Sequence, residues 1–242
     1  MAIIQVGYSN CLESADSITA TSSATNYSTN RLKDRDFGKL WLCGSTTTPQ
    51  RIVINQSTTP IASNCLIAYK HTLDTLGLIL EYGSDGVSYS TRTSWTQSGT
   101  GLIKIPYTAT TPNFWRLSHT SGTGTMRIAE LMLTNLVSFT AQPQQGLKES
   151  KYFCVKSLES KTGISTFLSF TTSKKNLEYS LIVGSTDKTY WQNVQTYFDT
   201  YGPFFFIDHQ GNEFIAELVD DLVFTPVSAT SYELNVKLQE VI

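Results

Sequence analysis

Short apolar runs separated by polar turn clusters recur through the first half of the chain. They lie at residues 40–43, 51–55, 65–69, 78–82, 102–105, 114–118 and 126–133. Regularly spaced runs of this length, bounded by turn residues, are typical of the strands of a β-sandwich or barrel. Ser84-Asp85-Gly86 and Ser121-Gly122-Thr123-Gly124 supply residues that tight reversals favour. We therefore predict an all-β unit without a helix. Residues 1–6, which lack a basic start and a long apolar run, are expected to form its first strand and not a signal peptide.

The pattern changes after residues 140–146, which are polar and have no strand periodicity. Strands are predicted at 152–158, 164–170 and 177–183, and a hairpin joins 204–207 to 213–219 through residues 208–212. Residues 232–238 alternate apolar with polar side chains, which predicts a final strand with one wet face. Between these strands an amphipathic helix is predicted over 187–201, with Asp187 in its first turn and Gly202-Pro203 as its stop. Its apolar face carries Tyr190, Trp191, Val194, Tyr197, Phe198 and Tyr201.

A chain of 242 residues is long enough for one large β domain or two ordinary ones. The change of pattern favours two. We place the first domain at residues 1–138, a linker at 139–146, and a smaller strand-rich α+β domain with one helix at 147–242. The fold class expected for the whole chain is mainly β.

Composition excludes several classes of function. The formal net charge is −2 and no basic cluster is present, so nucleic acid is not expected as a partner. No stretch approaches the about 20 apolar residues of a membrane span. Cys11, Cys43, Cys65 and Cys154 are far apart without a C-x-x-C pair, which predicts reduced, mostly buried thiols and no zinc. Only 16% of residues are charged, which suits surfaces covered by other subunits.

Catalytic chemistry is not expected. The sequence has no nucleophile elbow, zinc-protease motif or phosphate-binding loop. His71, His119 and His209 have no carboxylate or cysteine at ligand spacing except Asp208, which belongs to the predicted hairpin turn. We predict a protein that is not an enzyme and needs no cofactor or metal.

Several residues remain candidates for binding a ligand. Asp34 and Asp36 flank Arg35, and two interpretations stay open: a polar or calcium site, or the favoured ion-paired loop with Arg35 beneath the strands. Trp41, Trp95 and Trp115 are aromatic candidates for stacking on sugar rings, although core packing is favoured for Trp115. Polar neighbours from Tyr89 to Gln97 indicate a loop around Trp95 and make it the best of these candidates.

Lys70 and His71 end a predicted strand, where they either face a ligand or cap the strand. The ligand-binding residues considered are thus Asp34, Asp36, Trp41, Lys70, His71 and Trp95.

Read in order, the motifs of residues 34–131 resemble the discoidin-like, galactose-binding jelly roll, especially the versions found in bacteriophage tail proteins. The motifs are Asp34-Arg35-Asp36, Trp41, the strand ending at Lys70-His71, Gly83-Ser84-Asp85-Gly86, Phe114-Trp115-Arg116-Leu117 and Ile128-Ala129-Glu130-Leu131. The second half, with residues 203–214 and 234–240, is similar to the closing segment of minor tail and baseplate proteins. Unlike vertebrate discoidin domains, this one has no cysteine pair bracketing its ends, which argues against an extracellular eukaryotic role.

This resemblance implies a structural subunit of a phage tail tip or baseplate, made in the bacterial cytoplasm and assembled into the virion as a symmetric ring. Its partners would be other tail proteins and copies of itself. Tyr190, Trp191, Tyr197 and Tyr232 are the expected assembly contacts, because the second domain carries more aromatic surface than its own core needs. The alternative is a carbohydrate-binding module that recognises cell-surface glycans and serves host attachment.

Overall fold

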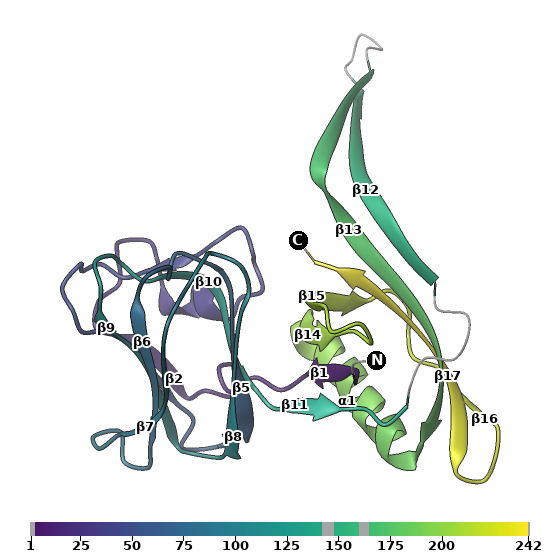
Figure 1. Cartoon of the computed structure of the whole chain (residues 1–242), viewed down its shortest axis with the longest axis horizontal. Helices are drawn as coiled ribbons and strands as arrows, with labels where there is room; N and C mark the ends of the chain where they lie inside the picture. Colours follow the sequence, from purple (N-terminus) through teal and green to yellow (C-terminus); the bar gives the residue numbers. More distant parts are fainter. Residues whose placement is uncertain (1–2, 142–147, 160–164, 242) are drawn as a thin grey trace. The chain divides into compact units, whose positions relative to one another are not determined.

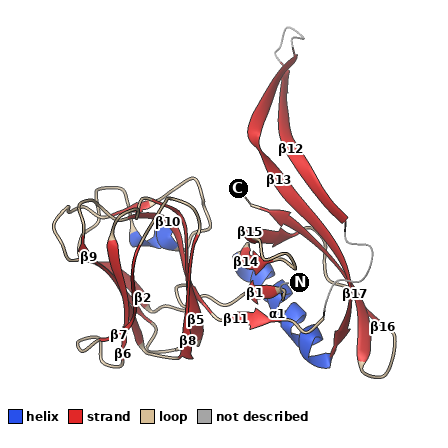
Figure 2. Cartoon of the chain, viewed as in Figure 1, coloured by secondary structure: helices blue, strands red, loops and turns tan. Residues whose placement is uncertain are grey.

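The computed structural model describes residues 3–141, 148–159 and 165–241, with side chains described outside 148–149 and 151–174. It divides into two compact units. We call Gly7–Leu136 the sandwich unit, and Met1–Val6 together with Val137–Ile242 the sheet unit. Figure 1 traces the chain through both units, and Figure 2 shows that strands dominate each of them. The mainly β fold class predicted from the pattern is confirmed.

The sandwich unit consists of two antiparallel sheets. The five-stranded sheet has the order β2 (Ser17–Ala20), β4 (Gln50–Asn55), β9 (Phe114–Ser121), β6 (Gly77–Gly83) and β7 (Ser90–Thr96). The four-stranded sheet has the order β3 (Trp41–Leu42), β10 (Arg127–Thr134), β5 (Ser63–His71) and β8 (Ile103–Thr110). A short 3-10 helix, Thr29–Leu32, is the helical element described here.

The core of this unit forms because alternate residues of the strands point inward. Ile52 and Ile54 of β4, and Trp115 and Leu117 of β9, are all buried, whereas Arg51, which precedes Ile52, is exposed. Trp41 and Trp115 are the largest side chains of the cluster and have no exposed surface. The predicted turns also form, with Gly86 at φ 73° and Gly122 at φ 100°.

One prediction for this unit was wrong. The segment around Trp95, expected to be a loop, is strand β7 at the edge of the five-stranded sheet, where Leu78 faces Trp95 and Leu80 faces Thr93. An edge strand pairs on one side and keeps much of its surface in water, so its composition is polar, and Thr is a good strand former.

The sheet unit is built on an eight-stranded sheet. Its main path runs β11 (Leu136–Ser138), β1 (Gln5–Gly7), β14 (Phe204–Ile207), β15 (Glu213–Leu218), β17 (Ser231–Glu240), β13 (Ser165–Gly184) and β12 (Lys148–Glu159), with β16 (Phe224–Pro226) paired to β17. In β17, Leu234, Val236 and Leu238 are buried between exposed polar residues, as predicted. The predicted hairpin forms as β14 and β15, closed by Gly211 at φ 88°.

Helix α1 (Ser185–Tyr201) confirms the predicted amphipathic helix. Trp191, Val194 and Tyr197 are buried. Its C-terminal end is marked by Gly202, whose N–H donates to the Phe198 carbonyl and whose φ is 87°. The left-handed conformation there is one that glycine adopts without cost.

Two segments belong to a different unit from the one expected. Strand β1, assigned from sequence to the first domain, lies between β11 and β14 in the sheet unit. Residues 139–141, assigned to the linker, are packed: Phe139 is buried and its ring centroid lies 4.6 Å from that of Trp191. The sequence did not indicate the burial of Phe139, because the residues that follow it are mostly polar. The rest of the expected linker, 142–146, lies outside the described residues.

Candidate ligand pockets

The Asp34-Arg35-Asp36 loop is ion-paired, as favoured from the sequence. Arg35 is held between the carboxylates of Glu130 and Glu13, with its Nη2 3.0 Å from Glu13 Oε1. Asp36 pairs with Lys39 at 2.7 Å, and Asp34 accepts a hydrogen bond from the Asp36 N–H. Within the described part of the chain no group of three His, Cys, Asp or Glu residues could hold a metal ion.

The tryptophans considered for sugar stacking are not equally accessible. Trp41 has no exposed surface, and its Nε1 donates to Ser23 Oγ at 3.0 Å, so it has no face to offer a ligand. Trp115 is equally buried, as favoured. Trp95 is partly buried and packs on the core from β7.

Lys70 and His71 hold loops at the end of β5. Lys70 is exposed, but its Nζ donates to the Phe37 carbonyl at 3.1 Å, which places it beside the Asp34–Asp36 loop. Both His71 ring nitrogens are used, one with the Gly101 carbonyl and the other with the Leu73 N–H. Burial lowers the pKa of His71, which favours the neutral imidazole that these bonds require.

A hollow of about 420 Å³ in the sandwich unit was not anticipated from the sequence. We call it the tyrosine pocket. It lies where β6 ends, β7 begins and β8 ends. It is lined by two tyrosines together with serine, threonine, glycine and proline residues: Tyr82, Gly83, Ser84, Ser88, Tyr89, Ser90, Thr110, Thr111 and Pro112.

Ionic contacts fix one wall of the tyrosine pocket. The Arg116 guanidinium carbon lies 3.8 Å from the centroid of the Tyr89 ring. Arg116 is in turn bound by both oxygens of Glu81 at 2.6 and 2.7 Å. The hydrogen bond from Arg116 holds the pKa of Glu81 below its usual value, so this carboxylate stays charged and keeps the arginine under the ring.

The turn beside this wall is fixed as well. Asp85 Oδ1 accepts hydrogen bonds from the N–H groups of Val87 and Ser88, at 3.0 and 2.8 Å. These backbone hydrogen bonds lower the pKa of Asp85, and the bond from Ser88 has the largest effect. The predicted turn thus presents Ser84, Ser88 and Tyr89 in one fixed arrangement. The turn motif at Gly83-Ser84-Asp85-Gly86 does not by itself predict the pocket, because Thr110, Thr111 and Pro112 come from a separate segment.

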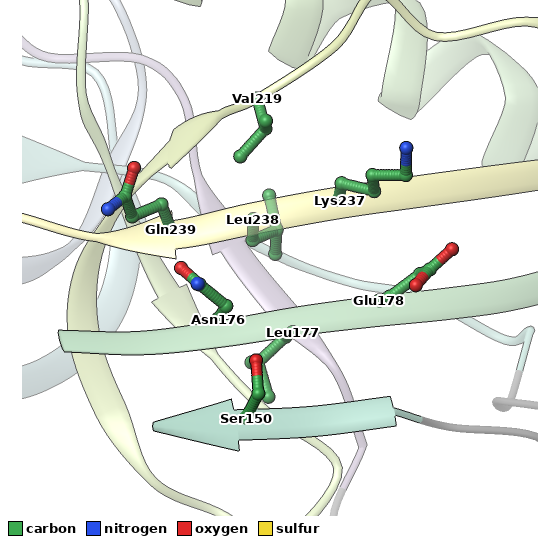
Figure 3. A pocket seen from close by; sticks show the side chains of 8 residues that line it. All are labelled: Ser150, Asn176, Leu177, Glu178, Val219, Lys237, Leu238 and Gln239. Carbon is green, nitrogen blue, oxygen red and sulfur yellow. The ribbon is translucent and has the colours of Figure 1, made fainter. Parts of the chain in front are cut away.

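A second hollow, of about 330 Å³, lies on strands β12, β13 and β17 of the sheet unit. Figure 3 shows its lining: Asn176 and Gln239 side by side at one end, Glu178 and Lys237 at the other, with Val219 above them. Asn176 Oδ1 is buried without a hydrogen-bond partner among the described residues. Lys237 binds Asp220 at 2.7 Å. The hollow can therefore accept a hydrogen-bond donor from a ligand. Its lining contains no histidine or cysteine that would form a nucleophile and base pair.

The expected assembly contacts are mostly internal. Trp191 is fully buried and Tyr197 is 6% exposed, so both belong to the core of the sheet unit. Tyr190 packs edge-on against Phe139, with ring centroids 6.0 Å apart. Tyr232 is half-buried, with Lys188 Nζ 3.7 Å from its ring centroid. Tyr190 and Tyr232 alone keep partial exposure among these four.

Cys11, Cys43 and Cys65 are buried thiols, as predicted, and burial raises the pKa of Cys11 to about 12. Cys154 lies outside the residues whose side chains are described. No helix described here is long and apolar enough to cross a membrane.

Comparison with known proteins gives similarities to solved structures. No family model and no curated protein matches the sequence. The chain is similar to chitosan-binding module 1 of a chitosanase/glucanase from Paenibacillus sp. IK-5, with 18% identity over 51% of this chain and 97% of that one, at a TM-score of 0.43. It is also similar to the module CpGH89CBM32-5 from Clostridium perfringens in complex with GalNAc-β-1,3-galactose (17%, 51% and 98%, 0.45). A third is the family 32 module of C. perfringens NanJ in complex with galactose (14%, 52% and 96%, 0.44).

Proposed function

We propose that the sandwich unit is a carbohydrate-binding module and that the tyrosine pocket receives the sugar. The observation that carries this proposal is the lining of the pocket, which combines two tyrosines, Tyr82 and Tyr89, with serine and threonine residues. Aromatic rings pack against the apolar faces of sugar rings, and hydroxyl groups both donate to and accept from sugar hydroxyls. The volume of the pocket is in the range of small-ligand sites.

Binding fits the pocket better than catalysis. Its lining contains neither a histidine nor a carboxylate that could serve a hydroxyl as general base. Tyr89 is held in advance by Arg116, and the turn beside it by Asp85, so a sugar meets a preformed wall. We therefore propose no enzymatic activity for the pocket, and a screen for glycosidase activity on bound glycans should be blank.

The test is a glycan array followed by calorimetric titration of the best glycan. Tyr89→Ala should weaken binding by about tenfold or more, because the aromatic surface on which the sugar ring packs is lost. Tyr27→Ala is the matched control, since Tyr27 also lies beside an arginine, with the Arg31 guanidinium carbon 5.2 Å from its ring centroid. If Tyr89→Ala binds normally while Lys70→Ala or Trp95→Ala does not, the sugar site lies at the other end of the sandwich.

A second candidate function is that of a structural subunit of a phage tail tip or baseplate, with the sandwich unit serving host attachment. The observation that favours it is the ribbon of β12 and β13. Strand β17 pairs with residues 176–184 of β13, whereas residues 165–169 and 173–175 pair with β12 alone. Figure 1 shows this two-stranded ribbon extending past β17. A two-stranded ribbon is marginally stable in water by itself, so we propose that it docks on a neighbouring subunit.

This second proposal is tested by a reconstruction of the phage particle. Several copies arranged around the tail axis, with the ribbon in contact with a neighbour, would support it. Absence of the protein from purified virions would contradict it and leave the carbohydrate-binding proposal unaffected.

A further inference from the structure

Arg92 occupies an irregular position at the edge of the five-stranded sheet. Along β6 and β7, Leu80 pairs with Thr93 but the next residue, Glu81, pairs with Thr91, so Arg92 is the extra residue of a β-bulge. A bulge changes the direction of a side chain on an edge strand. In a regular strand, the side chain of Arg92 would point to the opposite face of the sheet from those of Thr91 and Thr93. The bulge instead brings its side chain among aromatic rings.

Two tyrosines and one carbonyl surround the Arg92 guanidinium. Its central carbon lies 5.8 Å from the ring centroid of Tyr82 and 5.8 Å from that of Tyr107. One terminal nitrogen donates to the Thr108 carbonyl of β8. Tyr82, Ser90 and Thr110 line the tyrosine pocket. Ser90 lies two residues from Arg92 on β7, and Thr110 lies two residues from Thr108 on β8. Arg92 therefore stands next to the pocket, on its β7–β8 side.

The positive charge of Arg92 has no counter-ion in the described part of the protein. No carboxylate forms an ion pair with it, and its Nε is buried without a hydrogen-bond acceptor. The other charges near the pocket are compensated. Arg116 is bound to Glu81, and the carboxylate of Asp85 accepts from two backbone N–H groups. An uncompensated, partly buried guanidinium attracts an anion.

We propose that Arg92 makes the tyrosine pocket selective for acidic saccharides, with the carboxylate of a uronic acid unit accepting from the guanidinium N–H groups that Thr108 does not use. Planar carboxylates match the donor geometry of a guanidinium, and the resulting charge-assisted hydrogen bonds are stronger than those of neutral sugars. This inference rests on the proposed function, because it names the ligand class of the same pocket.

The experiment compares trimers of galacturonate, mannuronate and glucuronate with their carboxyl-reduced, neutral counterparts by calorimetric titration. The unmodified chain should bind at least one acidic trimer about tenfold or more tightly than its neutral counterpart. This preference should shrink as the salt concentration is raised from roughly 0.02 to 0.5 M, because salt screens the attraction between the partly exposed Arg92 guanidinium and the uronate carboxylate. Arg92→Gln should remove the preference and keep the neutral affinity, whereas Arg92→Lys should retain part of it.

The control is Arg51→Gln, because Arg51 is an exposed arginine on β4 of the same sheet, and β9 and β6 separate β4 from the strand β7 that carries Arg92. It should leave the preference unchanged. Equal binding of acidic and neutral trimers, or a preference that survives Arg92→Gln, would overturn the inference while leaving the carbohydrate-binding proposal standing. If neither these trimers nor any glycan of the array binds, both fail. A melting curve of each variant shows whether it folds. If Arg92→Gln does not fold, the partial loss of preference expected for Arg92→Lys decides the result.

Discussion

Two carboxylates compete for one guanidinium beneath the strands of the sandwich unit. Glu130 is 1% exposed, and it shares Arg35 with Glu13. Burial raises the pKa of Glu130 to about 8 and that of Glu13 in the same direction. Burial disfavours the two negative charges more than Arg35, and Lys33 beside Glu13, favour them, so we expect the pair to retain a proton near neutral pH.

Protein stability should therefore fall as the pH rises through this range. An unfolded glutamate releases its proton near its ordinary pKa of 4.5, whereas the folded Glu130 releases it near 8. Between these values the folded state binds more protons, so the free energy of unfolding decreases with pH, by an amount on the order of a few kcal/mol. Urea unfolding of the chain between pH 4.5 and 8.5 measures it.

Glu130→Gln is the variant that isolates this effect, because it keeps the shape of the side chain but cannot ionise. The variant should unfold with a flatter dependence on pH, and Glu217→Gln, a change in the sheet unit, should not alter the slope. A free energy of unfolding that rises from pH 5 to 8 in the unmodified chain would rule out the retained proton.

At the residue scale the sequence predicted the ion-paired role of Arg35 but not its partners. Glu13 and Glu130 lie 22 and 95 positions from Arg35, and no local pattern links them. The tyrosine pocket was missed for the same reason, since Tyr89 and Thr110 meet through the fold. Trp41 was a candidate because an aromatic ring can stack on a sugar ring, yet its ring belongs to the core.

At the element scale, strong periodicity was the part of the sequence that predicted structure well. Helix α1 and strand β17 were predicted because each keeps one period over many residues. Strand β7 was missed, because an edge strand with one bulge and mostly hydroxyl side chains has no apolar alternation. Strand β2 was missed as well, since it is short and also lies at an edge of its sheet.

Asp187 fastens the segment after β11 to the first turn of α1. Its carboxylate accepts from Thr140 Oγ1 at 2.7 Å and from the Ala141 N–H at 2.8 Å, and it is 2% exposed. We predict that Asp187→Ala lowers the free energy of unfolding of the sheet unit by about 1–3 kcal/mol, because buried donors lose their acceptor. Hydrogen exchange at the amides of Thr140 and Ala141 should become faster.

The matched control for this change is Asp199→Ala, which removes an exposed carboxylate from the same helix. It should alter the melting temperature and the exchange at residues 140–141 very little. Unchanged exchange in Asp187→Ala would show that Phe139, packed on Trp191, holds the segment without help.

At the scale of the whole molecule, the sequence predicted two regions but not how the chain is divided between them. A three-residue strand such as β1 carries too little pattern to reveal its partner, which lies about 200 positions further along. The sheet unit therefore contains both ends of the chain, and the sandwich unit lies between them in sequence. We propose that Gly7–Leu136 is a domain that folds on its own.

This arrangement predicts an unusual result of limited proteolysis. A cut within residues 142–146 should leave two fragments that stay together on gel filtration, because β1 and β11 remain in the sheet with β14. Expressed separately, residues 7–136 should give a cooperative melt, whereas residues 148–242, which lack β1 and β11, should not. Fragments that separate without denaturant would contradict the observed strand order.

The entry and exit of the sandwich unit lie side by side. Gly7 ends β1 and Leu136 begins β11, and a Cβ placed on Gly7 would lie 3.2 Å from Leu136 Cδ2. Neighbouring strands are about 4.8 Å apart, so a reverse turn of a few residues can bridge this gap. The whole unit is thus a cassette: evolution or an engineer can remove it, or exchange it for another module with adjacent ends, without breaking the sheet that receives it.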